Sequence, residues 1–373
     1  MDLSNYIIIL ERRNIMCKKL IVSIFIVLVL VLAGSASAVY TYWNNNAPGD
    51  SSWCSAGNWS AGVPGSLDTA TIKTPDRGPV IATGCDARAS TIKGPNPSFG
   101  HTQVMDVNGT GTLSTKSWLW RDGTGTAIIN IADSATVSVT TGNFRGTDNG
   151  VSILNISGGP NITVSGDLRG GDEAGWFYVN MSGGYLDIGN EFLIGDNGGG
   201  DINMSGGTII VRDDMDMGGL RGSAPININM TGGLIRIEKE FRFPGSVSRG
   251  GHIWLNLDGG AIDCDQFHHG ASTHTDDWRV DIEGSGELRI HGDVKAAIDA
   301  NVAAGQITAY DGEGTVVVNF ADGNTVVTSL PPVPNTATNP DPSDRGVNID
   351  PNGVISWTPG KGAVSHDVYL GTD

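Results

Sequence analysis

One short phrase recurs through this chain of 373 residues: an apolar residue, Asn, an apolar residue, then Ser, Thr or Asp, then Gly-Gly. Its five full copies carry Asn155, Asn180, Asn203, Asn229 and Asn256. Degenerate copies add Asp106 and Asn130 before them and Asp281 after them, at intervals of 23–27 residues. A repeat of this length indicates a solenoid, because a single unit cannot bury its apolar face and must stack on its neighbours.

Each repeat contains three short segments in which apolar and polar residues alternate. In the copy around Asn203 they are Ile202–Met204, Ile209–Val211 and Met215–Met217, with Gly206-Gly207 between the first two. Alternation puts the apolar side chains of each strand on one face, and glycine allows a sharp turn without a Cβ clash. We therefore predict an all-β fold: a right-handed parallel β-helix of about eight rungs, each of 23–27 residues.

Stacking of equal rungs predicts columns of equivalent residues. The Asn residues should face outward and form a hydrogen-bonded amide ladder of Asn130, Asn155, Asn180, Asn203, Asn229 and Asn256. Four of them also lie in Asn-x-Ser/Thr sequences, the acceptor pattern for N-linked glycans, but such regular crowding favours the ladder. A second predicted column consists of Asp187, Ile210, Arg236, Asp263 and Arg289, an exposed row of modest energetic value.

The first 38 residues resemble a secretory signal peptide. Lys18 and Lys19 precede an apolar run from 20 to 32, and Ala36-Ser37-Ala38 is a cleavage pattern. Met16 is therefore a candidate for the true start of translation. Without residues 1–38 the formal net charge changes from −17 to −19, because two acids and four bases are removed. This charge argues against nucleic acid or an anionic membrane surface as a partner, and no later run is long enough to span a bilayer.

Three cysteines follow the predicted cleavage site. Cys54 and Cys85 flank the N-terminal segment and are candidates for a disulfide in an exported protein. Cys264 takes the place of Ile or Val in the repeat, so it should point inward. No metal-binding spacing is present among the Asp and His residues of 263–277. Acidic turns at 195–201 and 311–314 make calcium an unspecific candidate, and we expect no cofactor.

Residues 39–100 differ from the repeats in composition and pattern. They contain Trp53, Asn58-Trp59, Gly62-Val63-Pro64 and Asp68–Ile72. We interpret them as an N-terminal cap or divergent first rungs, since a solenoid needs a cover for its open end. With the Gly-Gly rungs at 101–329, this pattern resembles secreted bacterial repeat proteins related to autotransporter passengers, over about residues 40–320. The resemblance implies a β-solenoid that is exported to the bacterial surface or medium.

The C-terminal part changes composition again. Residues 330–346, rich in Pro, Asn and Thr, indicate an extended linker. Residues 347–373, with Val354–Trp357 and Ala363–Leu370, resemble the first strands of a fibronectin type III-like module, a partial β-sandwich cut short at Asp373. The chain is therefore expected to be the N-terminal part of a larger modular protein, with its own downstream modules as neighbours.

Two sets of residues are candidates for function. Exposed aromatic pairs would suit stacking on sugar rings, and the pairs two residues apart are Trp118 with Trp120 and Trp176 with Tyr178. Carboxylates on adjacent rungs could serve acid–base catalysis, and the best set is Asp213, Asp214, Glu238 and Glu240. The aromatic pairs could equally fill the interior, and the carboxylates could equally form a solvated face.

No single rung stands out from the others as a catalytic site would. The repeat therefore favours a secreted or cell-surface solenoid with a structural or adhesive role over an enzyme. The alternative is a carbohydrate-binding or polysaccharide-degrading β-helix domain of the lyase or hydrolase kind. In either case the expected partner is an extracellular polysaccharide or a cell-surface glycan.

Overall fold

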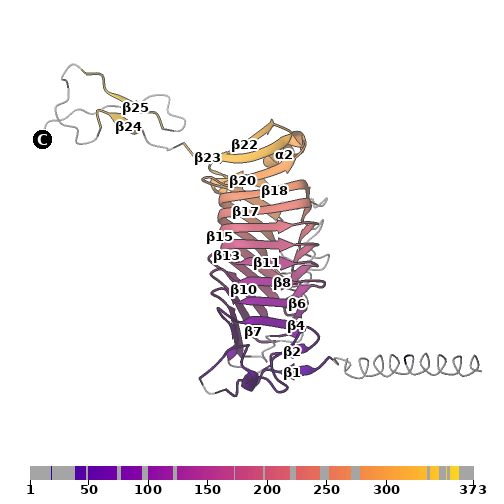
Figure 1. Ribbon diagram of the computed structural model, residues 1–373. Coiled ribbons are helices and arrows are strands. Elements are labelled where there is room, and N and C mark those ends of the chain that lie inside the picture. Colours follow the sequence, from indigo (N-terminus) through magenta and orange to yellow (C-terminus); the bar gives the residue numbers. More distant parts are fainter. Residues whose placement is uncertain are drawn as a thin grey trace, which may run out of the picture.

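The computed structural model of the chain is all-β, with a parallel β-solenoid of about nine turns, one more than the sequence predicts (Figure 1). The described residues are 18, 38–47, 49–73, 77–94, 100–120, 124–171, 173–195, 198–218, 224–243, 252–269, 278–333, 337–343, 350 and 353–360. The predicted signal peptide therefore lies almost wholly outside them. Within the described part of the chain, no helix combines the length and apolar character needed to cross a membrane.

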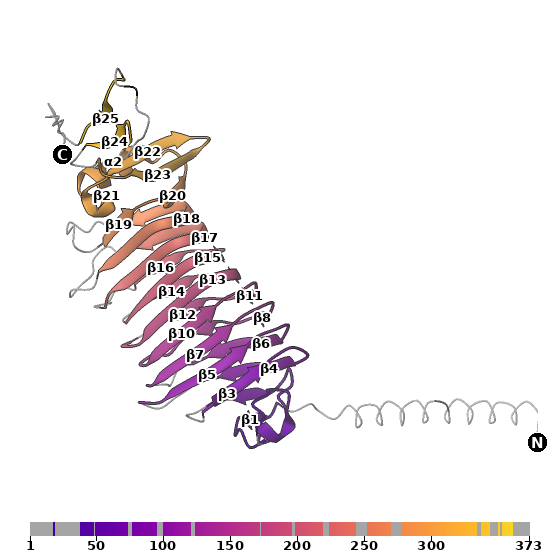
Figure 2. The ribbon, with the colours of Figure 1, turned by 90° about the vertical axis from the view of Figure 1, so that its left-hand side faces the viewer.

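Three parallel ladders of strands run the length of the solenoid, and Figure 2 shows the rungs stacked obliquely from β1 to β20. The Asn sheet, which carries the Asn column, consists of β3 (Arg77–Ile81), β5 (Thr102–Val107), β7 (Thr126–Ile131), β10 (Val151–Ile156), the first parts of β13 (Trp176–Ile188), β15 (Gly199–Val211), β17 (Ile226–Phe243) and β18 (Ile253–His269), then β19 (Trp278–Ile282) and β21 (Ile307–Ala309).

The second sheet follows each Gly-Gly turn. It contains the first parts of β4 (Asp86–Lys93) and β6 (Thr112–Leu119), then β8 (Thr136–Val139), β11 (Asn161–Val164), the middle or end parts of β13, β15, β17 and β18, and β20 (Glu287–His291). The third sheet contains β1 (Tyr40–Tyr42), β2 (Thr69–Thr71), the ends of β4 and β6, β9 (Phe144–Arg145), β12 (Leu168–Gly170), β14 (Phe192–Ile194), β16 (Met215–Met217) and the ends of β17 and β18.

Inward side chains of the three sheets form one continuous core. In the rung around Asn203, all six residues that alternation predicts to face inward are buried: Ile202, Met204, Ile209, Val211, Met215 and Met217. Cys264 is also buried, in register with Ile237 and Ile290, and its surroundings raise the pKa of its thiol by excluding water. Each rung thus buries its apolar face against the next one, about 4.8 Å away.

The Gly-Gly turns are required by close packing between rungs. Gly207 has a φ of +88°, and a Cβ on it would lie 2.7 Å from the Met181 side chain of the preceding rung. A Cβ on Gly206 would lie 2.8 Å from the Ser182 carbonyl oxygen. A side chain at either position would push adjacent rungs apart, so the glycines are needed for spacing as well as for the turn.

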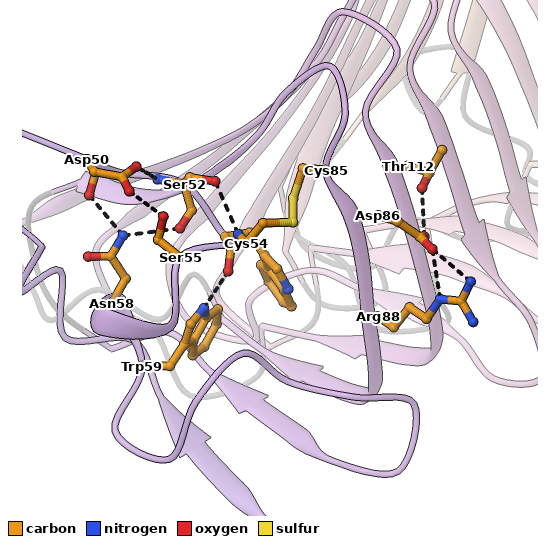
Figure 3. Close-up of a disulfide and its surroundings, with 11 residues drawn as sticks. Asp50, Ser52, Cys54, Ser55, Asn58, Trp59, Cys85, Asp86, Arg88 and Thr112 are labelled. Atoms are coloured by element: carbon orange, nitrogen blue, oxygen red, sulfur yellow. Dashed lines mark hydrogen bonds and ion pairs between the residues drawn. A yellow bond between two sulfur atoms is a disulfide. The ribbon is translucent and has the colours of Figure 1, made fainter.

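The N-terminal end is closed by an aromatic cluster next to the only disulfide of the described residues (Figure 3). The indole of Trp59 lies 4.7 Å from Trp53 and 5.2 Å from Trp43, measured between ring centroids, and all three are buried. Cys54 is bonded to Cys85, which ties this segment to the turn before β4. Because β1, β2 and β3 already pair in parallel with later strands, residues 39–100 contain both divergent rungs and their cover.

The C-terminal end differs from the sequence prediction of repeats up to residue 329. Helix α2 (Lys295–Ala303) interrupts the repeat, and β22 (Thr315–Ala321) and β23 (Asn324–Leu330) form an antiparallel hairpin. Strand β23 also pairs antiparallel with β20, and Ile298 and Val327 are buried against the core. The hairpin and helix cover this end of the solenoid in Figure 1, so exposed strand edges are blocked at both ends.

Beyond the solenoid, β24 (Thr338–Asp341) and β25 (Ser356–Thr358) form a separate two-stranded antiparallel sheet. Strand β24 lies in the segment interpreted as a linker, which therefore contributes a strand. Strand β25 contains Trp357 of the expected fibronectin type III-like region. The second expected strand there, Ala363–Leu370, lies outside the described residues.

Candidate functional site

The Asn column forms an unbroken chain of side-chain hydrogen bonds along the outside of the Asn sheet. Each Nδ2 donates to the Oδ1 of the residue one rung before it, at 2.8–2.9 Å, from Asn256 back to Asn130. The chain ends on a carboxylate, because Asn130 Nδ2 donates to Asp106 Oδ1 at 2.7 Å. All members therefore have the same orientation, which lets the amide dipoles reinforce one another.

Removing one amide from the middle of the ladder should destabilise the fold measurably. Asn180→Ala deletes the bonds to Asn155 and Asn203, and we expect a loss of about 2 kcal/mol, at about 1 kcal/mol for each bond. Urea unfolding followed by circular dichroism measures the loss. Ser182→Ala, at an exposed position of the same strand, is the matched control and should change stability by less than about 0.5 kcal/mol. Equal losses in both variants would contradict a stabilising ladder.

Beside the Asn column, a second outward column of the same sheet carries aromatic residues. Its register runs from Tyr178 through Asp201 and Asn227 to Trp254 and Arg279. The rings of Trp176 and Tyr178 are stacked, with centroids 6.1 Å apart and planes 12° from parallel, and both are half-buried. Trp254 lies three rungs farther on, about 14 Å along the axis. It is 45% exposed and is stacked on His252 at 4.0 Å.

Two connected hollows follow these columns. The first is an open hollow of about 460 Å³ between Asn155 and Thr231, lined by uncharged residues of successive rungs: Asn of the ladder, the Ile or Met after it, and the Ser or Thr that follows. The second encloses about 390 Å³ near Trp254 and shares Asn229 and Thr231 with the first. Together they form the Asn-face groove, which runs parallel to the solenoid axis. Trp254 lines its second hollow, while Tyr178 lies in the outward column next to the Asn column.

The structure overturns one of the two predicted aromatic surface pairs. Trp118 and Trp120 are both 0% exposed and pack on Phe144, with Trp118 4.9 Å from its ring centroid. The Trp118 indole N–H donates to the Gly94 carbonyl oxygen at 2.8 Å. Prediction of this pair as a binding surface is therefore wrong: both rings fill the interior, because Trp118 stacks in register between the buried Ile92 and Phe144.

The four predicted catalytic carboxylates are each held by a cation or a backbone donor. Asp213 pairs with Lys239 at 2.7 Å, and Glu238 pairs with Arg212 at 2.9 Å. Asp214 and Glu240 lie on adjacent rungs, with Arg242 bonded to both at 2.8 and 2.7 Å. The structure therefore brings Asp214 and Glu240 together, and it leaves Asp213 and Glu238 in separate surface ion pairs.

The same region contains a carboxylate that the sequence interpretation did not select. Asp216 is half-buried, and one of its oxygens is buried without a hydrogen-bond partner. Burial, together with a hydrogen bond to Glu191, raises the pKa of Asp216 to about 7, and Asp214 adds to the rise while Arg242 opposes it. Asp216 therefore keeps its proton in the folded protein up to near neutral pH.

The raised pKa of Asp216 predicts a pH dependence of stability. Because the folded-state pKa of Asp216 lies above its ordinary value of 3.8, its contribution to stability is complete below 3.8 and is lost as the pH rises toward about 7. We expect Asp216→Asn to flatten this part of the curve of unfolding free energy against pH. Asp322→Asn, on the exposed turn between β22 and β23, serves as the control. An unchanged slope in Asp216→Asn would contradict the prediction.

Within the part of the chain that the structure describes, no group of three or more His, Cys, Asp or Glu side chains is arranged to hold a metal ion. The acidic turn at 195–201 lies partly outside that part, as do His274, Asp276 and Asp277. The remaining acidic turn, at 311–314, contributes Asp311, whose carboxylate pairs with Arg279.

Sequence reasoning missed Trp254 because no second Trp, Tyr or Phe lies two positions away; the ring that stacks on it belongs to His252. The repeat could have identified it, because Trp254 lies two residues before Asn256, just as Tyr178 lies two residues before Asn180. Comparison with protein-family models, with curated proteins and with solved structures finds no significant match to this chain. The functional conclusion therefore depends on the geometry of the Asn-face groove and of the Asp216 region.

Proposed function

We propose that this protein is a rigid structural segment of an extracellular or cell-surface protein, and that its Asn-face groove adheres to a linear polysaccharide. The solenoid of about nine turns corresponds to a rod about 40 Å long. The disulfide and the signal-peptide pattern of residues 1–38 support export into an oxidising compartment. Both ends of the rod are covered, which favours a free-standing structural unit over further stacking of rungs.

The observation that carries the adhesive role is the position of the aromatic rings in the outward column next to the Asn column. Tyr178 and Trp254 lie in one outward column about 14 Å apart, with the polar pair Asp201 and Asn227 between them. Asn227 Nδ2 donates to Asp201 Oδ1 at 2.7 Å, which holds both side chains in place. Aromatic rings suit the apolar C–H faces of sugars, while amide and hydroxyl groups suit their hydroxyls. Their separation suits an extended chain of several sugar units.

Polysaccharide binding tests this function. We expect the protein to bind one polysaccharide class in a glycan panel, and Trp254→Ala to weaken that binding about tenfold through lost ring stacking. The control is Phe320→Ala, which removes an equally exposed aromatic ring from the hairpin strand β22, away from the Asn sheet. Binding that is absent, or that weakens equally in both variants, would remove the adhesive role and leave the structural one.

A second function, cleavage of a polysaccharide, is favoured by one specific observation. The pKa of Asp216 is raised to about 7 by burial and by the neighbouring Glu191, Arg242 lies 3.8 Å from Asp216, and Arg169 is bonded to Glu191 at 2.8 Å. A carboxyl group whose raised pKa lets it donate a proton, placed near a second carboxyl group, is the arrangement used for acid catalysis at a glycosidic bond. Release of reducing ends from polysaccharides, abolished in Asp216→Asn, would establish this activity. Release that is absent, or that Asp216→Asn leaves unchanged, would exclude it for this pair.

A further inference from the structure

The end of the Asn-face groove nearest the C-terminal cap has a strong negative charge. Four carboxylates line this hollow, which we call the terminal pocket: Asp258, Asp281, Glu283 and Asp311. Its one cationic lining residue is Arg279, which is paired with Asp281 at 3.4 Å and with Asp311. The lining therefore keeps a formal charge of −3, whereas the groove farther along is lined by uncharged residues only, among them Asn, Ser and Met.

One of these carboxylates is fixed by its position in the fold. Asp281 occupies the ladder column next to Asn256 and is nearly buried, with 5% of its surface exposed. It accepts hydrogen bonds from the Thr308 hydroxyl and from the backbone N–H of Asp311 at 3.1 Å. The negative charge at the base of the terminal pocket is therefore held in place before any ligand arrives.

One neighbouring carboxyl group, that of Glu283, is affected by both burial and this charge. Glu283 lies half-buried on the same side, and its pKa is raised, first by loss of water and then by repulsion from Asp258, Asp281 and Asp311. A cation in the terminal pocket would relieve that repulsion. A carboxylate or sulfate group on a ligand would increase it, so acidic sugars are disfavoured here.

Trp254 provides the apolar wall of the terminal pocket. Its ring is stacked on His252 at 4.0 Å with planes 27° from parallel, and 45% of the residue's surface stays exposed to solvent. An indole ring attracts both the C–H face of a sugar and a nearby ammonium group. The combination of this ring with a fixed negative charge indicates a ligand that carries a sugar ring and a positive charge together.

We propose that the terminal pocket binds an ammonium-bearing amino-sugar unit, and that the following units of the same polysaccharide lie along the Asn-face groove toward Tyr178. This inference rests on the proposed adhesive function and names its ligand class. The sugar ring stacks on Trp254, and its ammonium group lies among Asp258, Asp281 and Glu283. Uncharged hydroxyl and amide groups of the groove contact the remaining units.

The test compares two probes of equal length, a β-1,4-linked glucosamine oligomer with free amines and its fully N-acetylated counterpart. Isothermal titration at low ionic strength, at a pH where the amines are protonated, should give about tenfold tighter binding of the free-amine oligomer, the combined value of two exposed ion pairs. High salt should reduce this preference. Asp258→Asn with Glu283→Gln should abolish it, while Asp322→Asn on the distant hairpin turn should leave it unchanged.

The outcomes separate the two proposals. Trp254-dependent binding of both oligomers with equal affinity would overturn the amino-sugar assignment and retain the adhesive function. A preference that survives in the double variant would also overturn the assignment, because the charge would then act elsewhere. Binding of neither these oligomers nor any member of the glycan panel, by protein with an intact β-sheet spectrum, would overturn both.

Discussion

Replacement of Cys54 by Ser is expected to lower the free energy of unfolding of the N-terminal rungs by about 3–4 kcal/mol. The disulfide to Cys85 closes a loop with a sequence separation of 31 residues, and the cross-link lowers the entropy of the unfolded chain by an amount that grows with loop length. Cys54 is itself exposed, so the Ser side chain causes little loss of packing. Urea unfolding, with hydrogen exchange of β1 to β4, measures the change.

The single and double variants provide the control for the disulfide. Cys54→Ser and the double change of Cys54 and Cys85 to Ser should agree to within about 0.5 kcal/mol, because either one removes the same bond. The aromatic cover formed by Trp43, Trp53 and Trp59 should become more accessible to a fluorescence quencher in both. Unchanged stability in Cys54→Ser would show that packing of these indoles, without the cross-link, holds the end of the solenoid closed.

The second large effect is expected for Trp118→Ala, with a loss of about 3–5 kcal/mol. The substitution leaves a large cavity at a site with no exposed surface, and it removes contacts with Trp120 and Phe144. It also leaves the Gly94 carbonyl oxygen without the indole donor. Denaturant unfolding of the variant measures the loss, and binding to polysaccharide below the transition should be unchanged.

Trp254→Ala is the matched control for Trp118→Ala. The same residue type is removed, but 45% of the Trp254 surface is already exposed, so the loss of stability should stay below about 1 kcal/mol. The two variants should therefore show opposite phenotypes: Trp118→Ala destabilises without affecting binding, and Trp254→Ala weakens binding in a stable protein. The reverse pattern would show that the assignment of inner and outer faces is incorrect.

Much of the fold could be predicted from the repeat because stacked rungs have a simple geometry. The 23–27-residue interval between successive Asn positions places those residues directly above one another, and the register Asn155–Asn180–Asn203 follows from it. The same reasoning predicts the charge column, in which Arg236 lies between Ile210 and Asp263 and pairs with Asp263 at 2.9 Å. Loop lengths differ between rungs, but the strands before and after each Gly-Gly turn keep the same offset to the next rung, as Asn180 with Asn203 and Tyr185 with Thr208 show.

The candidate site could be predicted only in part. Trp176 and Tyr178 do lie together on the outside of the Asn sheet, as alternation allows. The terminal pocket could not be predicted from the sequence. Asp311 comes from the 3₁₀ turn after β21, and it meets Asp281 only through the folded C-terminal cap. The raised pKa of Asp216 likewise depends on its burial beside Glu191, which the sequence does not specify.

The sequence by itself determined the period, the strand register and the outward Asn ladder, because these follow from equal spacing and from the alternation of side chains along a strand. Only the tertiary structure decided which face of each aromatic strand points inward and how the C-terminal end is closed. Alternation shows that Trp118 and Trp120 share a face, yet packing against Phe144 and Gly94 places that face inside. Trp254 lies outside for the same physical reason, since the core positions beside it are filled by Ile253 and Leu255.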